Sequence, residues 1–392
     1  MSFSRLLLPL CLLLAGCDPT PQPLQPKTLI VGMDGVQLSE YEKLQDSNLK
    51  TELLYGKAYT GGITGRASEQ ETVSGPGWMT MLTGVWANKH GVTSNALSLR
   101  VDPAFPSLFK RLRQAMPNAY LSSVVHWSPI NTAFLLEDAQ GNNVRESGLS
   151  DEQVTVRTLQ ILSSSTADFT FIQLDEPDAV GHASGFGAAY QQALRDVDAR
   201  LGRLLDKVKE RRAQNPQENW LVIVSTDHGR DIRGVGHGGT SEQEKTLFIA
   251  SNQALNEELT QPSIPEDNPG PNNLYSFAAQ ASIAPTVLRH MGVALRPEWR
   301  LDGTPLLGDT GVRKVRADEA NARLLWNSTA QGSVSIHRNG QVMANVPAYV
   351  QAWTDPQGML QANDYVLVLD ETPVAVRNLP ARKPRVIAEG SD

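Results

Sequence analysis

The sequence has almost no cysteine. Its 392 residues contain two, Cys11 and Cys17, so the chain after Cys17 has no thiol. This excludes disulfides and thiolate metal sites from the body of the protein. A chain of this length does not need disulfides, because it can bury enough apolar surface to stabilise a core.

Long apolar runs are also lacking. The one apolar run near the start, Leu6–Leu14, follows Arg5 and is too short to span a bilayer as a helix. Small residues follow it, and residues 1–16 are therefore predicted to be a secretory signal peptide. No other segment is long and apolar enough to cross a membrane.

The residues Leu14-Ala15-Gly16-Cys17 resemble the processing site of bacterial lipoproteins. The resemblance implies cleavage before Cys17 and attachment of lipid to that residue; the alternative is an ordinary signal peptide with an incidental cysteine. Asp18 resembles the signal that keeps some Gram-negative lipoproteins in the inner membrane. We therefore expect a lipid-anchored protein of the bacterial cell envelope, facing the periplasm or the exterior.

Residues 17–26 form a predicted linker. Four prolines lie between Asp18 and Pro26, a composition typical of an extended, semi-rigid spacer.

The sequence also has fewer basic than acidic residues, since the formal net charge is −7 and the pI is near 5.6. This argues against a nucleic-acid polymer as partner.

The body, residues 27–315, alternates apolar β-branched runs with amphipathic helical patterns, which predicts an α/β fold with a mostly parallel sheet sandwiched by helices. The predicted strands are Thr28–Met33, Leu121–Val125, Phe169–Leu174, Trp220–Val224 and Thr246–Ala250. The predicted helices are Ser107–Met116, Asp151–Leu162, Ala188–Arg211 and Ser282–Met291.

Residues 316–392 have a different pattern. Short strands are predicted at Leu324–Trp326, Ser333–Val346, Tyr365–Leu369 and Pro373–Val376. Asn339-Gly340 predicts a two-residue type I′ turn within the second of these. A small β-sandwich-like module is expected, and its sequence faintly resembles fibronectin type III repeats.

Six side chains that suit a metal ion follow predicted strands. Ligands gather beyond the carboxyl ends of strands in such sheets, and one rim could collect all six. Mixed aspartate and histidine sites suit Zn²⁺ and tolerate Mn²⁺, so two divalent cations are predicted. The six are Asp34, Asp178, His182, Asp227, His228 and His237.

Ser74 is the candidate nucleophile. Pro76 is well placed to begin a short helix over Gly77–Leu82, at whose amino end free N–H groups favour an anion. A metal ion beside Ser74 would lower the pKa of its hydroxyl and make it a nucleophile. The alternative is that Ser74 only caps the helix. Asn95 would offer an amide donor to a phosphoryl oxygen.

The segments that contain the six ligand candidates, together with Ser74-Gly75-Pro76 and Leu82–Asn95, resemble the alkaline phosphatase superfamily and follow one another in its order. They are most similar to its type I phosphodiesterase/nucleotide pyrophosphatase branch. The resemblance covers about residues 27–307. It implies one metal on Asp178, His182 and His237, and a second on Asp34, Asp227 and His228. It also implies that Ser74 bridges toward the second metal as nucleophile and that Asn95 binds phosphate.

Two departures from the diesterase pattern concern the subclass: serine replaces the usual threonine nucleophile, and Gly77 stands where asparagine is common. A monoester usually needs an arginine beyond the two metals, whereas a neutral amide meets the single charge of a diester. Lys89 is the only basic residue between Ala67 and Leu99. The shortage of positive charge favours diesters as substrates, although Arg66 or Arg230 could reach a bound phosphate.

The sequence thus predicts a two-metal hydrolase that cleaves phosphodiesters or nucleotide pyrophosphates through a phosphoserine at Ser74. Its partner would be a small-molecule or lipid head-group phosphate ester. Alternatives on the same site are a phosphomonoesterase or a phosphoethanolamine-type transferase. A sulfatase is disfavoured because Ser74-Gly75-Pro76 is not followed by the arginine of that family's motif. The non-enzymatic alternative is an envelope glycan-binding lipoprotein with a structural metal domain.

Overall fold

A computed structural model describes residues 24–164, 166–265, 268 and 270–380. The predicted signal peptide, Cys17 and Asp18 lie outside these residues, so the lipid anchor stays a prediction. Within the described part of the chain, none of the helices combines the length and apolarity that a bilayer crossing requires.

The larger part of the chain is built on an eight-stranded sheet with the order β4-β3-β5-β1-β6-β7-β2-β8. Pairs β3/β4, β3/β5, β1/β5, β1/β6 and β2/β8 are parallel, whereas β7 runs antiparallel to both β6 and β2. The strands are β1 (Gln25–Met33), β2 (Leu54–Tyr59), β3 (Tyr120–Val125), β4 (Val144–Ser147), β5 (Ala167–Leu174), β6 (Glu218–Ser225), β7 (Thr246–Ser251) and β8 (Ala278–Ala279).

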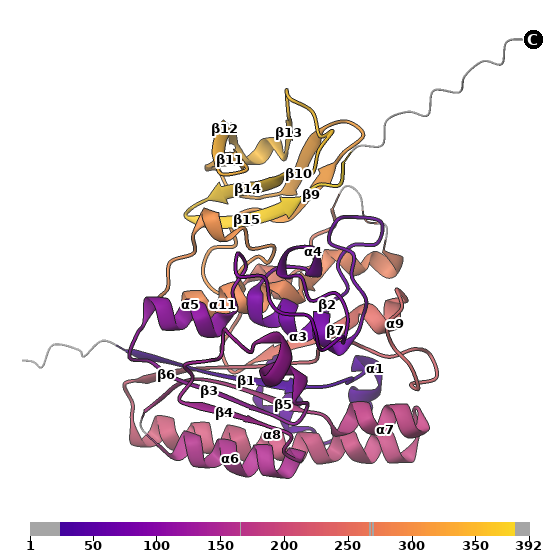
Figure 1. Ribbon diagram of the computed structural model, residues 1–392, viewed down its shortest axis with the longest axis vertical. Helices are drawn as coiled ribbons and strands as arrows, with labels where there is room; N and C mark the ends of the chain where they lie inside the picture. The colour runs from indigo at the N-terminus through magenta and orange to yellow at the C-terminus, as the bar shows by residue number, and fades with distance from the viewer. Residues whose placement is uncertain (1–23, 165, 266–267, 269, 381–392) are drawn as a thin grey trace, which may run out of the picture.

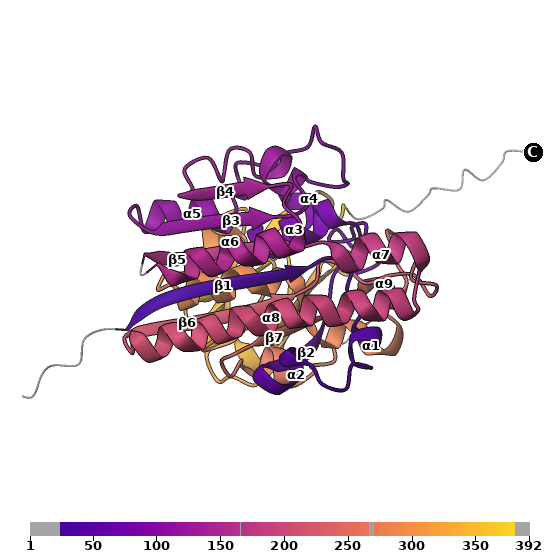
Figure 2. The ribbon, with the colours of Figure 1, turned by 90° about the horizontal axis from the view of Figure 1, so that it is seen from below.

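Helices cover both faces of this sheet, which confirms the predicted fold class. In Figure 1, α6 (Asp151–Ser163) and α8 (Ala188–Gln214) lie below the sheet, and α3 (Ser74–Thr83), α5 (Leu108–Ala115) and α11 (Ile283–His290) lie above it. Figure 2 shows α6 and α8 running across the lower face. The remaining α-helices are α1 (Leu38–Tyr41), α2 (Asn48–Glu52), α4 (Ala87–His90), α7 (Glu176–Ser184), α9 (Glu242–Lys245) and α10 (Glu257–Thr260).

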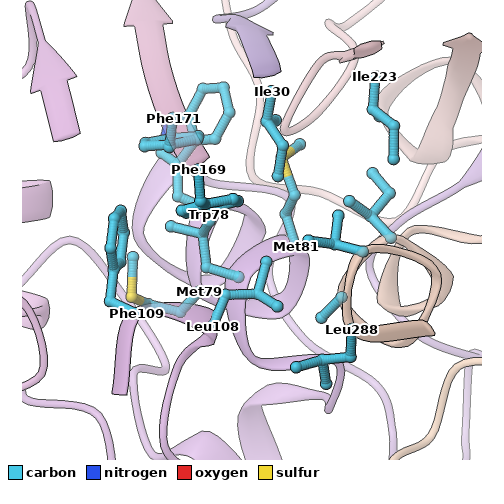
Figure 3. Close-up of a cluster of buried hydrophobic side chains, with 14 of the residues drawn as sticks. Ile30, Trp78, Met79, Met81, Leu108, Phe109, Phe169, Phe171, Ile223 and Leu288 are labelled. Atoms are coloured by element: carbon cyan, nitrogen blue, oxygen red, sulfur yellow. The ribbon is translucent and has the colours of Figure 1, made fainter. Parts of the chain in front are cut away.

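Alternation along the central strand divides the apolar core in two. Ile30 of β1 packs with α3, α5 and α11, whereas its neighbours Leu29 and Val31 pack with the α6 and α8 side. Successive side chains of a strand point to opposite faces, so one strand supplies both cores. In the upper core Trp78 of α3 meets the ring of Phe171 edge-on, with the ring centroids 5.9 Å apart (Figure 3).

The C-terminal part forms two antiparallel sheets, β13-β10-β9 and β12-β11-β14-β15, around a core of their own. Asn339 and Gly340 both have positive φ, 50° and 84°, as the predicted type I′ turn requires. The strands are β9 (Arg313–Asp318), β10 (Arg323–Asn327), β11 (Ser333–Arg338), β12 (Gln341–Pro347), β13 (Ala352–Thr354), β14 (Asp364–Leu369) and β15 (Thr372–Arg377).

Among the boundaries that differ from the prediction, three concern the predicted domains or the helix that carries Ser74. β1 begins at Gln25, so the last two residues of the predicted linker belong to the sheet. The predicted start of the C-terminal module at residue 316 falls inside β9. Helix α3 begins at Ser74 and not at Gly77, because Ser74, Gly75 and Pro76 already have helical geometry after Val73.

Candidate metal centre

Three adjacent strands, β5, β1 and β6, end on the same rim of the sheet and carry most of the predicted ligands. Asp34 follows β1, Asp227 and His228 follow β6, and α7 follows β5. Because these strands are parallel, their carboxyl ends meet at one edge, and the side chains after them converge.

The first cluster consists of Asp178, His182 and His237. Asp178 and His182 are one turn apart on α7, and Asp178 Oδ2 lies 3.2 Å from His182 Nε2. His237, on the loop between β6 and α9, brings its Nε2 to 3.0 Å from His182 Nε2 and 3.7 Å from Asp178 Oδ1. One atom from each of the three residues lies within 4.8 Å of the others, so the group could hold a metal ion.

The second cluster is formed by two buried carboxylates around His228. Asp227 Oδ2 lies 3.3 Å, and Asp34 Oδ1 3.7 Å, from His228 Nε2. These two oxygens are buried without a hydrogen-bond partner. The other oxygen of each carboxylate accepts hydrogen bonds. Asp34 and His228 also group with Asp178, each offering an atom within 4.8 Å, so Asp178 lies between the two clusters.

Backbone carbonyls fix the tautomer of two of the histidines. His228 Nδ1 lies 3.0 Å from the carbonyl oxygen of Gly229, and His237 Nδ1 lies 3.0 Å from that of Thr72. A carbonyl only accepts, so each Nδ1 carries the hydrogen and each Nε2 keeps a lone pair. This is the arrangement that orients a metal-binding histidine.

Ser74 is the first residue of α3, and its Oγ lies 3.3 Å from His228 Nε2. The hydroxyl therefore sits at the second cluster and at the positive end of the α3 dipole. Gly75 follows without a side chain because a Cβ there would come within 2.7 Å of the Ser94 carbonyl. Gly77 is required as well, since a Cβ there would lie 2.7 Å from the Asp227 carbonyl.

Asn95 reaches the same helix terminus. Its Oδ1 accepts the backbone N–H of Gly75 at 2.7 Å, which fixes the orientation of the amide. The side-chain N–H groups are then the donors that remain beside Ser74.

Electrostatics favour a cation at this rim. Burial and the nearby Asp178 raise the pKa of Asp227 to about 7, and burial together with Asp227 raises that of Asp34. Burial lowers the pKa of His228 and of His237 to about 4. Divalent ions would offset the cost of these unpaired carboxylate oxygens, and three aspartates with three histidines form a donor set that fits Zn²⁺.

Two residues that orient Asp34 were not predicted from the sequence. Trp78 Nε1 and Gln173 Nε2 donate to Asp34 Oδ2 at 3.2 Å and 3.0 Å, which leaves Oδ1 bare. Gln173 could have been noticed as a polar residue within the buried strand β5. Trp78 gave no such signal, since an aromatic side chain in a helix usually indicates only core packing.

Comparison with known proteins gives a family match over part of the chain. Residues 100–231 match the family model described as type I phosphodiesterase / nucleotide pyrophosphatase. The match confirms the predicted resemblance and includes Asp178, His182, Asp227 and His228, whereas the other candidate residues lie outside it.

Curated relatives include the ectonucleotide pyrophosphatase/phosphodiesterase family member 3 of Mus musculus, 27% identical over 229 residues, which are 53% of this chain and 25% of that protein. The phosphopentomutase of Clostridium botulinum is 30% identical over 120 residues, 30% of this chain and 28% of that protein. The chain thus spans about a quarter of the length of the curated relatives that it matches.

Among solved structures, a 2-O GAG sulfatase aligns with a TM-score of 0.51 at 12% identity, over 90% of this chain and 85% of that chain. At this identity the similarity concerns the fold alone.

Proposed function

We propose that this protein hydrolyses phosphate diesters, with Ser74 as nucleophile. The observation that carries the proposal is the convergence of Ser74 Oγ, His228 Nε2 and the bare oxygens of Asp34 and Asp227 at the amino end of α3. A cap serine alone would not need two unpaired buried carboxylates beside it. Asp34, Asp227 and His228 would hold one divalent ion, and Asp178, His182 and His237 the other.

The ions would supply positive charge that lowers the pKa of the hydroxyl and of a water and stabilises the oxygen that departs. Ser74 Oγ forms a bond to phosphorus as the bond to the departing alcohol breaks, and the hydroxyl proton leaves with that alcohol. Water then attacks the phosphoserine, the bond between Ser74 Oγ and phosphorus breaks, and the serine regains its proton. The product is a phosphate monoester.

Diesters are favoured over monoesters because the two arginines that could supply extra positive charge already bind carboxylates of the protein. Arg230 is fully buried and pairs with Asp178, and Arg66 pairs with Glu319 at 3.0 Å. Asn95 offers neutral N–H donors beside Ser74, and these can meet the single charge of a diester.

A substrate panel tests the proposal. Purified protein loaded with zinc or with manganese is expected to release nitrophenol from bis-p-nitrophenyl phosphate faster than from p-nitrophenyl phosphate or p-nitrophenyl sulfate. Adding an acceptor alcohol then separates hydrolysis from transfer, since a transferase would form a new diester. A preference for the monoester or for the sulfate would reject the diesterase proposal.

Ser74→Ala should lower kcat on the diester on the order of 10³-fold or more, because it removes the attacking oxygen. Zinc content should stay at the wild-type level, since the substitution leaves the six aspartate and histidine side chains in place. Thr93→Ala, on the exposed loop before Asn95, serves as the control for a neighbouring hydroxyl. Turnover that survives in Ser74→Ala would exclude Ser74 as nucleophile.

A further inference from the structure

Arg230 is a charged residue near the metal centre that the proposed reaction does not use. It follows His228 by two positions, and it is among the largest fully buried side chains, with a relative exposure of 0%. A buried guanidinium is costly unless each of its donors finds an acceptor.

The acceptors come from two separate segments. Nη1 donates to Asp178 Oδ1 on α7, whereas Nε donates to the Gly234 carbonyl at 2.6 Å and Nη2 to the Val235 carbonyl at 3.1 Å. Gly234 and Val235 belong to the loop that leads into His237. A single planar side chain thus joins the helix that carries Asp178 and His182 to the loop that carries His237.

Glycines make the space for this side chain. A Cβ at Gly181 would collide with Arg230 Nε, and a Cβ at Gly35 would lie 2.7 Å from Nη1. Gly35 follows β1 and Gly181 lies within α7, so two elements leave room at the same point. The guanidinium is therefore enclosed and cannot reach a bound phosphate.

We propose that Arg230 is a positioning residue for the metal centre. By binding Oδ1 of Asp178, it fixes the carboxylate in the orientation that places Oδ2 next to His182. By binding the two carbonyls, it fixes the loop so that His237 Nε2 faces the same point. This inference rests on the proposed function for its purpose, but its geometry concerns cation binding alone.

Arg230→Met tests the inference, because methionine fills similar space without donors. Zinc stoichiometry measured by mass spectrometry, and zinc affinity measured by competition with a chelator, are expected to show one site weakened about 10- to 100-fold and the other unchanged. Arg230→Lys should not restore affinity, since an ammonium cannot replace three donors in one plane. Arg233→Met, an exposed arginine of the same loop, should bind zinc like the wild type.

Gly181→Ala gives an independent variant, because the new methyl group displaces the guanidinium while keeping its charge. It is expected to weaken the same zinc site, and it replaces Arg230→Met if that variant does not fold, as judged by circular dichroism. Wild-type zinc affinity in both variants would overturn the inference.

Kinetics separate positioning from substrate binding. With zinc saturating, Arg230→Met should lower kcat on the diester and change KM less than about threefold, whereas a substrate-binding arginine would raise KM with kcat unchanged. That second result would also overturn the inference. If the wild-type protein binds two zinc ions but cleaves no diester, the proposed function fails, and the zinc affinities still decide the role of Arg230.

Discussion

At the rim of the sheet that carries the metal centre, some residues matter because they leave space for their neighbours, and others because they form bonds. Gly77 is the clearest example. A Cβ at that position would lie 2.7 Å from the carbonyl oxygen of Asp227. Glycine is therefore required at this position for a steric reason.

We expect Gly77→Ala to lower the free energy of unfolding by about 1–3 kcal/mol, because the methyl group forces α3 away from Asp227. Alanine would otherwise favour the helix by about 1 kcal/mol, so a loss would report the collision. Zinc affinity should fall as well, since Asp227 is displaced. Urea denaturation and chelator competition measure the two effects.

Gly141→Ala is the matched control, because a Cβ at Gly141 meets nothing within 4 Å. Equal stability of Gly77→Ala and this control would contradict the steric explanation.

At the scale of elements, α3 is held against α4 through a buried histidine. His90 Nδ1 accepts the backbone N–H of Val92 at 3.1 Å, and Nε2 lies 3.2 Å from Thr80 Oγ1 of α3. Thr80 in turn donates to Gln70 Oε1 at 3.1 Å. This chain of hydrogen bonds sets the position of the helix that begins at Ser74.

Burial lowers the pKa of His90 to about 3, whereas the unfolded chain protonates near the ordinary value of 6.5. Between these values the unfolded state binds more protons, so the stability contribution is complete above about pH 6.5 and is lost as the pH falls toward 3. His90→Gln should reduce the slope of unfolding free energy against pH by about 1.4 kcal/mol per unit in this window.

Urea denaturation of zinc-free protein between pH 4.5 and 7 measures that slope, and His337→Gln on the β11–β12 hairpin gives the control. A slope that does not change in His90→Gln would show that His90 is not protonated on unfolding in this range.

Most of the elements could be predicted from the sequence, because buried strands and amphipathic helices leave clear periodicities. The predicted α8, for example, differs from the observed helix only at its end, Gln214. The direction of β7 could not be predicted, since a buried strand has the same composition whether it runs parallel or antiparallel. Strand β2 was missed because its first two residues are exposed and its middle consists of a glycine and a lysine.

The residues of the candidate site could likewise be predicted only in part. The ligand candidates follow from motifs that are local in sequence, such as Asp227-His228 at the end of β6. The residues that orient them do not, because Gln173 and Asp34 are 139 positions apart and Arg230 and Asp178 are 52 apart. No local pattern records such contacts, and only the folded chain brings them together.

For the whole molecule, the predicted lipid anchor lies outside the described residues and stays a prediction. Cys17→Ser should move the protein from the membrane fraction to the soluble fraction of a cell lysate, because it removes the sulfur that would carry the lipid. Palmitate labelling followed by fractionation measures this. Cys11→Ser, within the predicted signal peptide, is the control, and an unlabelled wild-type protein would contradict the lipoprotein prediction.

The two C-terminal sheets contact the larger part of the chain at particular points. Arg377 of β15 donates to the carbonyl of Asn88 on α4 at 2.7 Å, and Ala375 of the same strand donates to the Leu301 carbonyl at 2.7 Å. Asn88 stands midway in sequence between the end of α3 and Asn95. The C-terminal strands therefore support the segment that leads to Asn95, so the loss of β15 would remove contacts that hold this segment in place.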